Sequence, residues 1–128
     1  MKTAELQERT KSFALRVLNL IERLPNTIGG SVLANQIARS ATSVGANYRA
    51  ACRARSRAEF ASKLGTVAEE ADESLYWLEL IRDGKFVSGK RIASLVSEAD
   101  ELTAIFTSGR RSASRPQPSK IKPQTSLE

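Results

Sequence analysis

Apolar residues recur at intervals of three and four along four stretches of the chain, which is the spacing of one buried face of an α-helix. The pattern predicts helices over about residues 3–24, 31–53, 56–83 and 88–106. No strand-like alternation of apolar and polar residues competes with it. The chain is therefore expected to be all-α.

Local signals set the expected helix ends. Pro25 ends the first helix, because the residue before a proline is pushed out of the α-helical region. Ser56 and Glu59 have the spacing of a capping box at the start of the third helix, and Gly84 stands where a C′ residue would close it. Gly45 lies inside the second helix at a cost of about 1 kcal/mol relative to alanine, so we expect it to permit close helix contact.

Short connections make successive helices antiparallel neighbours, so the economical fold is an up-and-down four-helix bundle. The bundle is expected to cover residues 1–107. Residues 108–128 are rich in serine, proline and basic residues and show no apolar period. We predict that they form a disordered basic C-terminal tail.

Composition narrows the range of functions. The chain has no histidine, which removes the commonest general base and the commonest transition-metal ligand. We therefore expect no enzyme activity, no metal site and no cofactor. The formal charge of +6 favours polyanionic partners. A single cysteine, the lack of a visible export signal and the lack of an apolar run of roughly 20 residues predict a cytoplasmic protein that does not enter the membrane.

Arginines gather where the second helix meets the third. Residues 39–57 contain five arginines and no acidic residue. One interpretation is a solvated basic loop that pairs with neighbouring carboxylates. The other is a phosphate-binding patch, because guanidinium groups bind phosphates in a planar, bidentate way. The candidate nucleic-acid-binding residues belong to this junction and to the start of the tail: Arg49, Arg53, Arg55, Arg57, Arg110 and Arg111.

A second group of candidates concerns structure and assembly. A small polar stripe beside the apolar face of the second helix consists of Ser40, Ser43 and Asn47. These side chains are expected to form hydrogen bonds locally or across a helix interface. The acidic run at residues 69–79 is interpreted as helix surface or contact between subunits, since the Glu-x-x-His motif of di-iron bundles is missing. Aromatic side chains beyond the needs of one bundle predict a homo-oligomer. The candidate interface or structural residues are Ser40, Ser43, Asn47, Tyr48, Glu69, Glu73 and Trp77.

Three segments, Gln36–Asn47, Arg55–Phe60 and Glu69–Leu80, follow Leu24 and Pro25 in an order that resembles a known family. Over about residues 6–107 the chain is similar to the bacterial four-helix-bundle family called S23 ribosomal or 23S rRNA intervening-sequence proteins. The resemblance implies a left-handed up-and-down bundle that assembles into a ring-like homopentamer. Some members are encoded within insertions of 23S rRNA genes, and a related accessory protein of diversity-generating retroelements partners a reverse transcriptase.

The chain departs from the family pattern just after Asn47. Many members continue as Asn-Ile-Ala-Glu-Gly, whereas this chain has Tyr48, Arg49, Ala50 and Ala51 after Asn47. A family role that depends on the acidic position is therefore not expected here. The same change makes the junction more basic.

The preferred interpretation is a non-enzymatic oligomeric bundle that binds nucleic acid, with RNA as the expected class, or that scaffolds a nucleic-acid-associated protein. The alternative is a pure protein–protein adaptor whose arginines hold subunits together. Nucleic-acid binding should weaken steeply as the salt concentration rises. Little sequence preference is expected, because the sequence shows no aromatic stacking platform.

Overall fold

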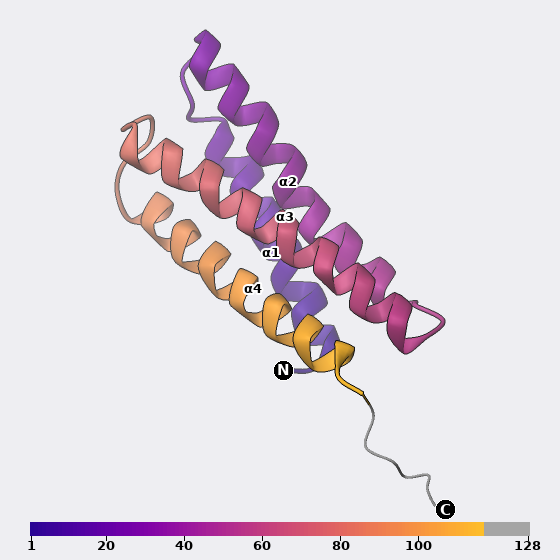
Figure 1. Cartoon of the computed structure of the whole chain (residues 1–128). Helices are drawn as coiled ribbons and strands as arrows, with labels where there is room; N and C mark the ends of the chain where they lie inside the picture. The colour runs from indigo at the N-terminus through magenta and orange to yellow at the C-terminus, as the bar shows by residue number, and fades with distance from the viewer. Residues whose placement is uncertain (117–128) are drawn as a thin grey trace, which may run out of the picture.

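The computed structural model describes residues 1–116, which form four helices: α1 (Thr3–Ile21), α2 (Ile28–Cys52), α3 (Arg57–Asp83) and α4 (Lys90–Ser114). Each helix runs opposite to the one before it, so the N-terminus, the α2–α3 turn and the end of α4 share one end of the bundle (Figure 1). The predicted all-α four-helix bundle is confirmed. The disorder predicted for residues 117–128 lies outside the described residues.

The turn between α1 and α2 is displaced from its predicted position. The α1 helix ends at Ile21 rather than near residue 24, and α2 begins at Ile28 rather than near residue 31. The early start of α2 has a local cause, because the Thr27 hydroxyl accepts a hydrogen bond from the Gly30 amide at 3.1 Å. A Cβ atom on Gly30 would overlap the Pro25 carbonyl oxygen, so this turn requires glycine there.

The start of α3 follows the predicted cap, with one difference. The Ser56 hydroxyl accepts a hydrogen bond from the Glu59 amide at 3.0 Å, as expected for the N-cap residue. The Glu59 carboxylate accepts from the amide of Arg55, at 2.7 Å, rather than from that of Ser56. Glu59 therefore stabilises the α2–α3 turn as well as the helix start.

Contrary to the prediction, Gly84 is not the C′ residue of α3. This residue is the C-cap and keeps a helical φ of −77°, while Lys85 takes the left-handed C′ position with a φ of 61°. The Phe86 amide then donates to the Ile81 carbonyl at 3.0 Å, which completes the Schellman motif. Glycine is still needed one residue earlier, because a Cβ on Gly84 would lie 2.8 Å from the Phe86 ring.

The boundary predicted at residue 107, between the helical bundle and a disordered tail, is wrong. The α4 helix continues to Ser114, so Arg110 and Arg111 lie on a helix and not in a disordered tail. Contacts with α3 explain the extension: a Cβ on Gly109 would lie in ordinary contact with Leu64, and Ala113 packs against the core. The helix stops where Arg115 becomes extended before a proline, with a ψ of 145°.

The core is built from the apolar faces of all four helices. Its largest fully buried side chains include Phe13 and Leu20 of α1, Ile37 of α2, Leu78 of α3 and Phe106 of α4.

The α1 helix packs closely on α2, since a Cβ on Gly45 would lie 3.3 Å from the Thr10 hydroxyl, as predicted for a close approach. On its other side, α1 is tied to α4 by the Arg9 guanidinium, which lies 2.7 Å from the Glu98 carboxylate and 2.6 Å from that of Glu101. Among residues 1–116, no helix combines the length and the apolar character needed to span a membrane.

Candidate nucleic-acid interface

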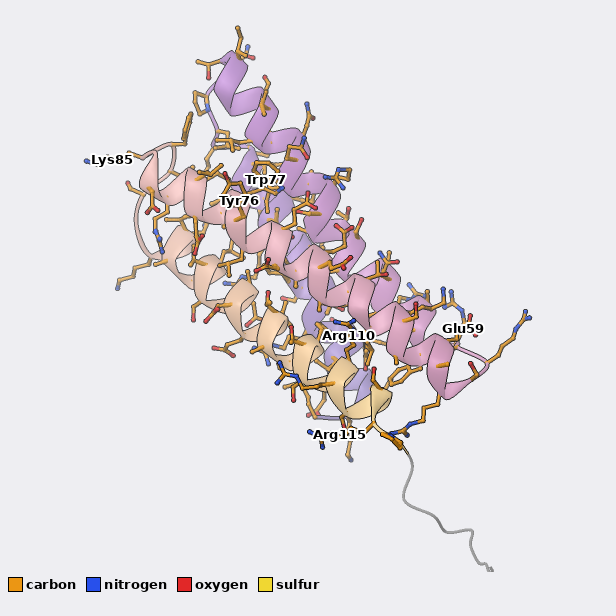
Figure 2. All side chains as sticks on the ribbon, in the orientation of Figure 1. Glu59, Tyr76, Trp77, Lys85, Arg110 and Arg115 are labelled. Atoms are coloured by element: carbon orange, nitrogen blue, oxygen red, sulfur yellow. The ribbon has the colours of Figure 1, made fainter. Side chains whose placement is uncertain are left out.

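The candidate arginines lie together at the end of the bundle where α2 and α4 finish and α3 begins. All of them are exposed. Figure 2 shows Arg110 of α4 and Arg115, which follows α4, at the same end of the bundle as Glu59 of α3. We call this surface the basic end, and it comprises Arg49, Arg53, Arg55, Arg57, Arg110, Arg111 and Arg115.

Helix dipoles account for only part of this cluster. Arg49 and Arg111 lie in the last turns of α2 and α4, where a cation stabilises a helix by about 0.3–1 kcal/mol. Arg55 and Arg57 lie at the opposite kind of position, just before α3 and at its first residue. A helix N-terminus disfavours cations. Helix stability therefore does not explain why arginines stand there.

Six arginines of the basic end form no ion pair among residues 1–116: Arg49, Arg53, Arg55, Arg110, Arg111 and Arg115. The ion pairs in this part of the chain involve Arg9, Arg39 and Arg82. The two carboxylates in the first turns of α1 and α3 accept hydrogen bonds from backbone amides: Glu5 from Lys2 at 2.9 Å and Glu59 from Arg55 at 2.7 Å. Of the five arginines at residues 39–57, Arg39 pairs with the Glu73 carboxylate, whereas Arg49, Arg53 and Arg55 form no ion pair within residues 1–116.

Two arginines of this end have structural contacts. Arg57 donates from Nη2 to the Ser112 carbonyl at 3.1 Å, which joins the start of α3 to the last turn of α4. Arg110 crosses α3 at Gly65, where an added Cβ would lie 3.2 Å from its Nε atom. These contacts orient two guanidinium groups on the surface.

The predicted polar stripe of α2 lies at the α2–α3 interface. The Ser40 and Ser74 hydroxyl groups, both fully buried, form a hydrogen bond of 2.8 Å between the two helices. The Asn47 side-chain amide donates to the Ser43 carbonyl at 2.8 Å within α2. These contacts explain the polar residues as packing and hydrogen bonding inside one subunit.

The acidic and aromatic candidates of α3 lie away from the basic end, and Figure 2 shows Tyr76 and Trp77 nearer to Lys85. The Glu73 carboxylate accepts from Arg39 of α2 at 2.6 Å and from the Trp77 indole at 3.1 Å. Glu69 is exposed on the same helix. No group of three or more residues able to hold a metal ion forms among residues 1–116.

Tyr48 differs from its predicted place among the surplus side chains available for subunit contact. It is only 5% exposed and packs against Phe106, with ring centroids 5.1 Å apart. Together with Phe60 these rings line an open pocket beside the basic end. No pattern in the sequence marks this aromatic group, because its members extend over 58 residues, from Tyr48 to Phe106, and come from three helices.

The family described as 23S rRNA-intervening sequence protein matches residues 2–108. The chain belongs to this family. It is also similar to a crystal structure of a protein of unknown function from the S23 ribosomal protein family of Bacteroides thetaiotaomicron, with 35% sequence identity and a TM-score of 0.77. That match covers 87% of this chain and 99% of the other. No curated protein matches the chain.

Proposed function

We propose that this member of the 23S rRNA-intervening sequence protein family is a cytoplasmic, non-enzymatic, oligomeric bundle whose basic end binds nucleic acid, with RNA as the preferred class. The observation that carries the proposal is a set of exposed arginines at one end, of which Arg49, Arg53, Arg55, Arg110, Arg111 and Arg115 form no ion pair within residues 1–116. Phosphates are the partners that such a cluster binds best. The family's name connects its members with ribosomal RNA, which supports RNA over DNA.

Assembly into a homo-oligomer, with a pentamer as the expected form, is part of the proposal. Apolar side chains remain exposed on three helices, and a subunit contact would remove them from water. They are Leu15 and Leu18 on α1, Ile28 and Val32 on α2, and Tyr76 and Leu80 on α3. A symmetric ring would repeat the basic end in every subunit and raise avidity without any new kind of contact.

The test is salt-dependent binding of the full chain to generic RNA. The variant Arg49→Ala/Arg53→Ala/Arg55→Ala should lose most of its affinity, and the parent should bind much more weakly at about 200 mM than at about 50 mM salt, as counterion release requires. Arg57 is left intact because it also bonds to the Ser112 carbonyl. The matched control, Arg23→Ala/Lys90→Ala/Arg91→Ala, removes three exposed charges from the opposite end and should bind nearly as well as the parent.

A pure protein–protein adaptor is the competing function, and the exposed apolar residues are the observation that favours it. An adaptor would leave RNA unbound at low salt, or would bind equally in both charge variants. Absence of binding at low salt would overturn nucleic-acid binding and assign the arginines to contacts between proteins. Equal binding by both charge variants would overturn the basic end as the binding site. Circular dichroism of both variants checks that the helices are intact.

A further inference from the structure

The four helices leave an open pocket of about 330 Å³ beside the basic end. Its apolar walls come from every helix: Leu6 of α1, Tyr48 of α2, Phe60 and Leu64 of α3, and Ile105 and Phe106 of α4. Arg57 and Ser112 also line it. A volume near 300 Å³ is at the lower limit of pockets that hold small ligands.

The aromatic rings differ in how accessible they are. Tyr48 and Phe106 are 5% and 2% exposed and pack against each other, so their positions are set by the core. Phe60 is only partly buried against that core, which leaves part of its ring open to a ligand. Small residues of α4, Gly109 and Ala113, line the same pocket and leave room beside the ring.

A second groove adjoins the aromatic pocket and is cationic. Arg57 and Ala113 line both spaces, and the second one is also lined by Arg110 and Arg115. No carboxylate of the described residues lines either space. A flat apolar site and a groove with three guanidinium groups therefore lie next to each other, with Arg57 between them.

We propose that the aromatic pocket takes one unstacked base of a single-stranded nucleic acid while the adjoining arginine groove holds the flanking phosphates. This inference rests on the proposed function and names the form of nucleic acid that the basic end prefers. A base presents a flat π-face to Phe60 and keeps its polar edge at the open mouth, which Arg57 and Ser112 also line. Bases inside a duplex are stacked on each other and cannot enter.

The proposal is tested with two oligomers of about 10 nucleotides, a length within the range of single-strand sites. One carries bases and the other is abasic throughout, so both have the same number of phosphates. The parent should bind the base-bearing strand about five- to tenfold more tightly, the lower range for the loss of one base–aromatic stack. A strand containing 2-aminopurine should change its fluorescence on binding, because stacking quenches that base.

Variants of one ring separate stacking from folding. Phe60→Leu keeps an apolar side chain against the core but removes the π-face, and it should bind both oligomers equally. Phe60→Tyr keeps the ring and should retain the preference. The matched control is Phe86→Leu, which removes a ring that is also partly buried against the core but lies in the α3–α4 turn, and it should change nothing.

The outcomes distinguish this inference from the proposed function. If the parent binds the abasic and base-bearing strands equally, or if Phe60→Leu keeps the preference, base insertion is wrong while salt-dependent phosphate binding stands. If the parent binds neither strand at low salt, the proposed function fails and the pocket proposal fails with it. A duplex bound more tightly than a single strand of equal phosphate count would also overturn base insertion.

Discussion

At the level of single residues, the net charge of the basic end depends on which groups its carboxylates contact. Glu59 could neutralise a neighbouring arginine, but its Oε1 atom accepts the Arg55 amide at 2.7 Å. A carboxylate near a helix N-terminus is favoured by the helix dipole as well as by that bond. The side chain of Arg55 therefore stays available to an external anion.

The buried carboxylate of Glu70 shows how burial affects the stability of the fold. Its Oε1 atom is buried and has no hydrogen-bond partner within residues 1–116. Burial, followed by the charge of Glu73, raises the pKa of Glu70 above its ordinary value. A raised carboxyl pKa means that the ionised form destabilises the fold, and this cost disappears as the pH falls through the folded pKa toward the ordinary value of 4.5.

The variant Glu70→Gln should therefore be more stable than the parent at neutral pH, and the difference should shrink as the pH falls to about 4. Urea unfolding at several pH values measures the difference in the free energy of unfolding. Glu69→Gln is the control, because it removes the same charge from an exposed position one residue away. A stability difference that stays constant from pH 7 to pH 4 would contradict burial as the cause.

At the level of secondary-structure elements, α2 and α3 are joined by a buried hydrogen bond between two serines as well as by the ion pair of Arg39 and Glu73. The Ser74 hydroxyl bonds to Ser40 and lies 2.8 Å from the Glu70 carbonyl oxygen of its own helix. Apart from Ser74, the Ser40 hydroxyl has only a long contact of 3.5 Å to the Ile37 carbonyl. Ser40 therefore depends on the hydrogen bond between the two serines more than Ser74 does.

Ser74→Ala should lower the free energy of unfolding by about 1–2 kcal/mol, because it leaves the buried Ser40 hydroxyl poorly bonded. Ser40→Ala should cost less, since Ser74 retains the Glu70 carbonyl. The double variant Ser40→Ala/Ser74→Ala should lose less than the sum of the two single changes, as expected for residues in contact. Equilibrium urea unfolding of the four proteins gives the coupling, and additive losses would show that the bond contributes nothing.

At the scale of the whole molecule, the exposed apolar residues of α1, α2 and α3 bear on assembly. Tyr76 and Leu80 lie one turn apart on α3 and are 53% and 37% exposed. A subunit contact at this face would bury both. The basic end lies at the far end of the same helix, so assembly through Tyr76 and Leu80 would leave the arginines accessible.

Light scattering should therefore give a mass well above that of the 14.0 kDa chain, and five copies would weigh about 70 kDa. The variant Tyr76→Glu/Leu80→Glu should shift the protein toward smaller species while its helicity is retained, because burying two carboxylates at a contact is costly. Ser88→Glu/Ser97→Glu, at exposed positions around α4, adds the same charge and should leave the mass unchanged. A parent that is monomeric at micromolar concentration would refute the assembly.

The number, type and order of the helices follow from local signals in the sequence. Apolar residues at intervals of three and four act within each helix, and cap residues such as Ser56 act within a single turn. Because these signals are local, they predicted the antiparallel four-helix bundle and the gathering of the α2–α3 arginines. They also indicated the close approach at Gly45.

Features that join distant parts of the chain depend instead on how the helices pack. Residues 108–114 have no apolar period, yet they are helical because Ala113 packs on the core and Ser112 accepts a bond from Arg57, 55 residues earlier. The pocket between Tyr48, Phe60 and Phe106 arises in the same way, from three helices that meet at one end. Patterns among neighbouring residues do not predict such contacts, because the contacts form only when the helices pack.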